Sequence, residues 1–233
     1  RYVITGYKSG YEYMDEFKML FPRMHSSQQH HIDAYKSWAD VKGKRIKYEY
    51  CGQTKVDYCP TFGENLRFFF RYQVNFMYWR YFMWNFAGRQ NDIQSAGELH
   101  KGNWISGIPF LDNLMLGDQS KLPTELRENK GHNVYYMLPL LLGVIGLIWQ
   151  LGKRNNEGKN KEGYRSFAIV FLLFFLTGLA IVVYLNQTPY QPRERDYAYA
   201  GSFYAFCIWI GLGVMAIIDM LNNVIKNEKI RTA

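Results

Sequence analysis

The pattern of hydrophobic and polar positions changes once along the chain, near Asn133. Residues 1–134 are polar, basic and aromatic, whereas residues 135–221 are dominated by Leu, Ile, Val, Phe and Gly. The second part holds three long apolar segments, at 135–151, 166–185 and 202–221. A helix needs about 20 apolar residues to cross a bilayer core, a length that the first segment reaches only with its flanks. We therefore predict a mainly α-helical integral membrane protein with three C-terminal transmembrane helices.

Small residues within two of these segments predict how the helices pack. Gly143 and Gly146 lie in the first segment, and Gly211 and Gly213 lie in the third. Glycine allows the backbones of two membrane helices to approach closely. We expect both pairs to take part in helix contacts.

The extramembrane region 1–134 is predicted to be of mixed structure. Residues 1–60 contain strand-like runs such as RYVITGY and RIKYEYCG between loop signals, and residues 87–134 are rich in turns. Residues 64–86 contain no Gly or Pro and predict one helix about 34 Å long.

Polar residues of the 64–86 helix do not gather on one face. On a wheel of 100° per residue, one stripe holds Glu64, Arg67, Arg71 and Asn75, while Gln73 and Arg80 lie elsewhere. This scatter fits a helix wedged between protein elements, or one at the membrane surface with snorkelling arginines. A helix of an aromatic-rich core is an equally good interpretation.

The net charge of +8 is explained by membrane topology better than by binding to nucleic acid, which we exclude. Residues 153–165 carry five Lys or Arg residues, and the tail 222–233 carries three more. The positive-inside rule places both segments in the cytoplasm and the loop 186–201 on the outer face.

Cysteine and histidine residues give no firm site. Cys51 and Cys59 are compatible either with a disulfide or with two unrelated thiols. His30 and His31 are adjacent, and adjacent side chains are expected to point apart, so we predict no metal site. No nucleotide-binding or hydrolase motif is present.

The loop 186–201 (NQTPYQPRERDYAYAG) concentrates charge between two apolar segments. It contains Arg193, Arg195, Asp196 and Tyr197, and its two prolines restrict the backbone. Arginine suits a phosphate group, so the loop is a candidate docking point for a lipid-linked phosphate. A network of Arg and Asp side chains that fixes the loop to the polar region is the alternative.

Several stretches of the chain resemble one bacterial membrane family that is similar to protein O-mannosyltransferases of the GT-C type. They are FRYQVNFMYWRYFMWNFAGRQNDIQ, NWISGI, YYMLPLLLGVIGL and YLNQTPYQPRERDYAYAGSFYAFCIWIGLG, within a resemblance that runs from about Tyr2 to Gly213. The resemblance implies a multi-span glycosyltransferase of the bacterial inner membrane that transfers a sugar from a polyprenyl-phosphate donor to a protein acceptor on the outer face. It also implies that this chain is an internal or C-terminal part, with an N-terminal transmembrane core of the same protein as its partner.

The resemblance assigns no catalytic residue here, because the catalytic acid of such enzymes lies in an early external loop that nothing in this chain matches. No cofactor is expected besides the lipid-linked donor. The candidate residues for binding lipid phosphate or substrate are Arg193, Arg195, Asp196 and Tyr197, with Arg71 and Arg89 as weaker candidates. A non-catalytic membrane scaffold or transport component is the alternative function.

Overall fold

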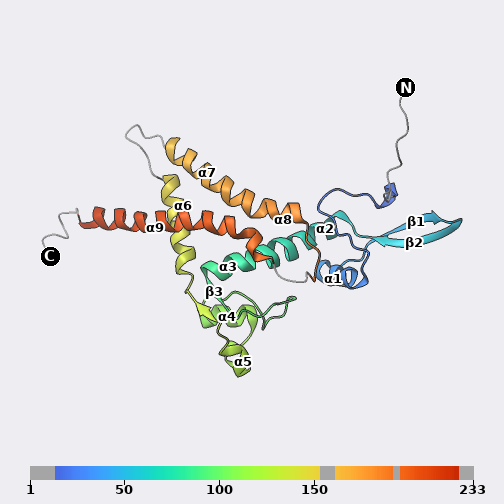
Figure 1. Ribbon diagram of the computed structural model, residues 1–233, viewed down its shortest axis with the longest axis horizontal. Coiled ribbons are helices and arrows are strands. Elements are labelled where there is room, and N and C mark those ends of the chain that lie inside the picture. The colour runs from blue at the N-terminus through green and yellow to red at the C-terminus, as the bar shows by residue number, and fades with distance from the viewer. Residues whose placement is uncertain (1–13, 153–160, 191–194, 226–233) are drawn as a thin grey trace, which may run out of the picture. The chain divides into compact units, whose positions relative to one another are not determined.

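The computed structural model describes residues 14–152, 161–190 and 195–225, and it is mainly helical (Figure 1). The chain divides into two compact units, residues 1–69 and 70–233. The change in composition near Asn133 is therefore not a boundary in packing, because residues on both sides of it belong to the second unit.

The first unit combines two helices with a β-hairpin. Its elements are η1 (Asp15–Phe17), α1 (Gln29–Ala39), β1 (Lys44–Tyr50), β2 (Gln53–Cys59) and α2 (Phe62–Phe68). The hairpin turns through Cys51 and Gly52, whose φ angles of 52° and 72° are those of a tight two-residue turn. Cys51 is exposed at the turn and Cys59 is buried where β2 ends, so both thiols are free and the hypothesis of a disulfide between them is wrong.

The expected strand at RIKYEYCG is confirmed by β1, while RYVITGY lies outside the described residues. The side chains of His30 and His31 do not point apart as expected. Their rings contact each other, with centroids 4.3 Å apart. Within the described ranges, no three His, Cys, Asp or Glu residues lie close enough to share a metal ion.

A buried carboxylate joins α2 to the loop before β1. Glu64 accepts hydrogen bonds from the backbone nitrogens of Thr61 (2.7 Å), Lys42 (2.7 Å) and Gly43 (3.1 Å). Thr61 in turn caps the N-terminus of α2 through its hydroxyl. Burial alone would raise the pKa of Glu64, but the hydrogen bonds from these backbone groups lower it to about 2.

The second unit begins with an unusual helix. The π-helix η2 (Phe69–Trp79) leads directly into α3 (Arg80–Phe86), so the predicted long helix is present but changes its bonding pattern midway. The short elements that follow are β3 (Gly88–Arg89), α4 (Pro109–Leu116), η3 (Gln119–Lys121), α5 (Thr124–Arg127) and β4 (Asn133–Val134). Strands β3 and β4 pair in antiparallel fashion.

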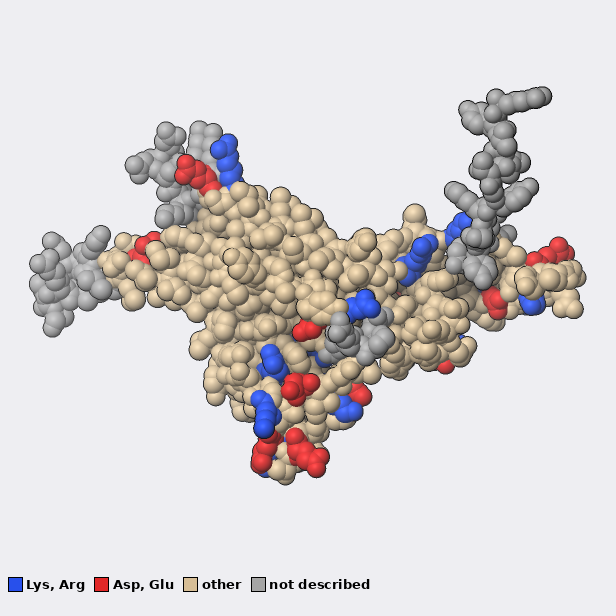
Figure 2. Space-filling model, in the orientation of Figure 1, with Lys and Arg blue, Asp and Glu red and all other residues tan. Residues whose placement is uncertain are grey.

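The apolar part of this unit consists of α6 (Leu138–Gly152), α7 (Lys161–Thr177), α8 (Leu179–Leu185), η4 (Asp196–Tyr199) and α9 (Ala200–Ile225). Two helical stretches are long and apolar enough to cross a membrane, Glu162–Leu185 and Asp196–Asn223. In the face seen in Figure 2, few charged side chains lie along α7 and α9 between their ends. The third expected span is not shown, because α6 has 15 residues and is shorter than a membrane crossing requires.

Aromatic residues of α3 form a core with the apolar helices. Phe82 and Phe86 both pack against Phe206 of α9, with ring centroids 4.9 and 4.6 Å apart. Trp209 of α9 donates a buried hydrogen bond from its indole nitrogen to Gln150 of α6 at 2.9 Å. The interpretation of 64–86 as a helix of an aromatic core therefore holds for the α3 part.

Glycine makes the crossing of α6 and α9 possible (Figure 1). A β-carbon at Gly146 would collide with the carbonyl oxygen of Trp209, and one at Gly213 would collide with the carbonyl oxygen of Leu142. A β-carbon at Gly143 would likewise collide with the ring of Phe206. A β-carbon at Gly211, in contrast, would meet nothing within 4 Å, so three of the four expected glycines contribute to packing.

Candidate functional site

The loop between the two long apolar helices is held at both ends by one helix, η2. At the first end, the side-chain amide nitrogen of Gln73 donates hydrogen bonds to Oδ1 of Asn186 and to the carbonyl oxygen of Gln187, each at 3.0 Å. At the second end, the Tyr78 ring packs edge-on against Tyr199 with centroids 5.4 Å apart. The Tyr78 hydroxyl also donates to Ser202 at 3.2 Å. The described ends of the loop are thus both attached to η2.

The π-helical bonding of η2 explains how one helix reaches both ends. In a π-helix the amide of residue i+5 bonds to the carbonyl of residue i, so the turn is wider and residues five apart lie closer to one face than in an α-helix. In an α-helix of 100° per residue, Gln73 and Tyr78 would point about 140° apart. The π-helix aligns them, and both side chains face the loop.

Burial keeps the hydroxyl group of Tyr78 protonated. Gln73 and Tyr78 are each 2% exposed. Burial raises the pKa of Tyr78 to about 12, although the hydrogen bond to Ser202 opposes this shift. The Tyr78 hydroxyl therefore remains a donor at any physiological pH.

The first end of the loop contains buried polar atoms with unused hydrogen-bonding capacity. Within the described structure, Oε1 of Gln73 and both side-chain polar atoms of Gln187 are buried without a hydrogen-bond partner. Leaving a buried polar group unpaired costs about 1–3 kcal/mol. Three such atoms at one place mark a position where a further polar group would be stabilised.

The sequence-predicted residues of the loop lie between these two attachments. Arg195 is half-buried, while Asp196 and Tyr197 are exposed in η4, and Arg193 lies outside the described residues. No carboxylate lies within ion-pair distance of Arg195 in the part of the chain that the structure describes.

The two weaker candidates are placed differently from each other. Arg71 is exposed on η2, two residues before Gln73, and so shares the helix that holds the loop. Arg89 belongs to β3, and its guanidinium stacks on the ring of Trp84 at 4.5 Å. The backbone of Arg89 pairs with Asn133 and with Trp104, and we assign this residue to the loop-rich region 87–134.

The region 87–134 is ordered by side chains that bond to its backbone. Arg80 is 4% exposed, donates to the carbonyl oxygen of Gly102 at 2.7 Å and stacks on Phe76 at 4.2 Å. Asn91 accepts from the backbone nitrogen of Gly102 at 2.8 Å and donates to the carbonyl oxygen of His100 at 3.0 Å. These buried side chains give the segment between β3 and α4, which contains no helix or strand, one defined conformation.

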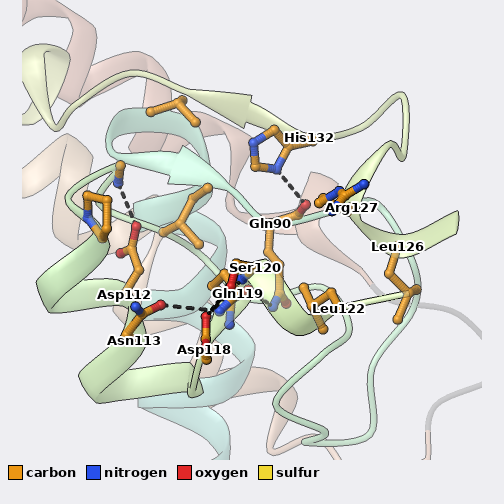
Figure 3. Close-up of a pocket in the computed structure, with 14 residues that line it drawn as sticks. Gln90, Asp112, Asn113, Asp118, Gln119, Ser120, Leu122, Leu126, Arg127 and His132 are labelled. Atoms are coloured by element: carbon orange, nitrogen blue, oxygen red, sulfur yellow. Dashed lines mark hydrogen bonds between the residues drawn. The ribbon is translucent and has the colours of Figure 1, made fainter. Parts of the chain in front are cut away.

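A pocket of about 400 Å³ lies within this region (Figure 3). Arg127 and His132 lie on one side of it, and Asp112, Asn113 and Asp118 lie on the other. Apolar side chains complete its wall, namely Ile105, Pro109, Leu122, Leu126 and Val134. Its size and mixed lining are those of a small-molecule site.

Most polar groups of the pocket are already occupied. Asp112 accepts hydrogen bonds from Ser106 at 2.7 and 2.8 Å and from Gly107 at 2.9 Å. Nδ1 of His132 lies 3.0 Å from the carbonyl oxygen of Gln90, which leaves Nε2 of that ring as the available nitrogen. The acidic side chains therefore shape the pocket wall, and they are poor candidates for acid or base chemistry.

Sequence reasoning missed the residues that hold the loop, Gln73, Tyr78 and Gln187. The sequence does contain one indication of Gln73, because this polar residue lies apart from the polar stripe of its helix. The aromatic surroundings of Tyr78 concealed its role.

Residues 1–70 match a family of unknown function (DUF8416). This range coincides with the first compact unit, residues 1–69. No curated protein matches the chain, and no solved structure matches it.

Proposed function

We propose that this chain is part of a membrane glycosyltransferase resembling protein O-mannosyltransferases, which transfers a sugar from a polyprenyl-phosphate donor to a protein acceptor. The proposal is supported chiefly by the loop between Asn186 and Tyr199, which joins two potential membrane-spanning helices and is attached to η2 at both ends. The same loop lies in the stretch with the most specific resemblance, residues 184–213.

The loop is suited to the leaving group of such a reaction. When the sugar leaves its donor, negative charge develops on the lipid-linked phosphate, and fixed cations lower the energy of that state. Arg195 offers a planar guanidinium at the end of a potential membrane span, where the phosphate of an embedded lipid would lie. Arg193 and Arg71 are assigned the same supporting role, with Tyr197 and Asp196 beside the sugar.

The proposed topology puts this loop on the outer face of the bacterial inner membrane. Arg165 and Glu162 at the start of α7 then lie on the cytoplasmic side, with the basic segment 153–165. The third predicted crossing corresponds to α6, which with 15 residues is shorter than a bilayer core requires. The catalytic carboxylate is supplied by an N-terminal membrane core of the same protein.

Replacing Arg195 by alanine in the full-length protein is expected to lower glycan transfer by tenfold or more, because a charge-assisted hydrogen bond contributes about 1.5–3 kcal/mol. Arg195→Lys keeps the charge but loses the planar fork, so it restores part of the activity. The measurement is mass spectrometry of glycosylated acceptor proteins in the cell envelope.

Arg165→Ala is the matched control, since it removes the same charge from the opposite end of the helical stretch Glu162–Leu185. Unchanged transfer by Arg195→Ala would remove the phosphate-docking role. If cells with and without the full-length protein have the same glycoproteins, the alternative of a non-catalytic scaffold or transport component is favoured.

A further inference from the structure

Helix α4 has its polar and apolar faces reversed with respect to a helix on the surface of a soluble domain. Three of its residues line the pocket, namely Pro109, Asp112 and Asn113. The opposite face is exposed and apolar, and it consists of Ile108, Phe110, Leu111, Leu114 and Met115. Phe110 and Leu114 are each 76% exposed. The one charged residue of the helix, Asp112, is 5% exposed and faces inward.

This arrangement follows from the spacing of the residues. At 100° per residue, the five apolar side chains fall within an arc of about 160°, and the pocket-lining residues fall in the remaining arc. A continuous apolar surface of this kind marks an interaction site. A helix that lies in the surface of a bilayer has an apolar face of this form, which enters the boundary between head groups and acyl chains.

The position of α4 identifies the bilayer as the surface that it meets. Gly107, directly before α4, is packed against Val134 and against the ring of Tyr136, where a β-carbon would approach Cδ1 to 3.0 Å. Two residues later the apolar helix α6 begins, and Figure 1 shows α4 beside that end of α6. Exposed apolar side chains continue along the first turns of α6, at Leu138, Leu141 and Ile145.

We propose that α4 is an interfacial anchor whose apolar face is inserted in the bilayer surface on the side where α6 begins. The proposal rests on the membrane location in the proposed function. It commits to lipid because the exposed face of α4 has no charge and because α4 lies beside the end of α6, whose first turns also expose apolar side chains. The pocket lies directly behind the anchored helix, since the other face of α4 forms its wall.

The test places a fluorescent label at single cysteines in the full-length protein, with the native cysteines replaced by serine, in vesicles of phosphatidylcholine and phosphatidylglycerol. Labels are attached at Leu114→Cys on α4, at Leu172→Cys on α7 and at Glu125→Cys on α5. Quenching is measured with nitroxide lipids labelled near the head group or deep in the acyl chain, and with aqueous iodide.

A label at position 114 is expected to be quenched at least about twofold more by the shallow nitroxide lipid than the label at position 125, and to be shielded from iodide. The label at position 172 reports on the membrane span and should be quenched by the deep nitroxide. The label at position 125 should be quenched by iodide.

Three outcomes overturn the inference, and they are distinguishable. If position 114 is as accessible to iodide as position 125 while position 172 is in lipid, α4 does not enter the membrane, and the membrane location stands. If position 114 is shielded from both lipid and iodide, protein covers the helix. If position 172 is also outside the lipid, the membrane location in the proposed function fails together with the inference.

Discussion

Replacing Gly146 by leucine is expected to destabilise the second unit by at least about 3 kcal/mol, at the upper end of the usual range for overpacking. The first added carbon already collides with the backbone of Trp209, which cannot rotate away as a side chain could. Helices α6 and α9 must therefore separate. Their separation also breaks the hydrogen bond from Trp209 to Gln150, which is buried where these helices meet.

The measurement is thermal unfolding in detergent, followed by tryptophan fluorescence, with Gly211→Leu as the matched control. Gly211 lies in α9, the helix that Gly146 of α6 contacts, and a side chain there meets open space. The control is expected to change stability by less than about 0.5 kcal/mol. Equal destabilisation by both variants would show that these helices do not pack through Gly146.

The second large effect is expected at Glu64 in the first unit. Alanine at this position leaves the backbone nitrogens of Lys42, Gly43 and Thr61 without their acceptor. We expect a loss of about 3 kcal/mol, because buried donors without partners each cost about 1–3 kcal/mol and water replaces some of the lost bonds. Hydrogen exchange at the amides of Lys42 and Gly43 measures this loss locally in the whole chain.

The same carboxylate predicts a dependence of stability on pH. The folded-state pKa of Glu64 is about 2, below its ordinary value of 4.5, so its contribution is complete above pH 4.5. It is lost as the pH falls from about 4.5 to about 2, and the difference corresponds to roughly 3 kcal/mol. Glu49→Gln is the control, because Glu49 is exposed in β1. A steep loss of amide protection that persists in Glu64→Gln would assign the pH dependence to other groups.

The features predicted correctly from the sequence are those that depend on local composition. An apolar run of about 20 residues favours a helix whatever it packs against, and Glu162–Leu185 and Asp196–Asn223 agree closely with the second and third predicted segments. The helix at 64–86 was also predictable, because no residue there interrupts the backbone.

Features that depend on contacts between distant residues were not predictable. A wheel of 100° per residue assumes α-helical bonding, and this assumption fails in η2, where Gln73 contacts a loop 113 residues away. The contacts of two residues in the polar stripe were likewise not predictable. Glu64 is buried by backbone groups of the loop before β1, and Arg67 donates to the carbonyl oxygen of Ala39.

The boundary between the two compact units was also not predictable from composition. The first unit ends at Phe69 because the contacts of α2 are with α1, whereas α3 packs against α9. The hydropathy of a segment gives no information about which other segment it packs against. Loop residues such as Arg195 were identifiable from their unusual setting, but their attachment to η2 was not.

The attachment of both loop ends to η2 has a practical consequence for dividing the protein. If the chain is cut between Tyr190 and Arg195, the first fragment contains η2, including Gln73 with its partner Asn186. The second fragment contains Tyr199 and Ser202, which contact Tyr78 of η2 in the first fragment. The fragment that begins at Arg195 also retains the packing surface of α9 for α6. Two separately produced polypeptides should therefore reassemble, which makes this protein a candidate for complementation experiments and for segmental isotope labelling.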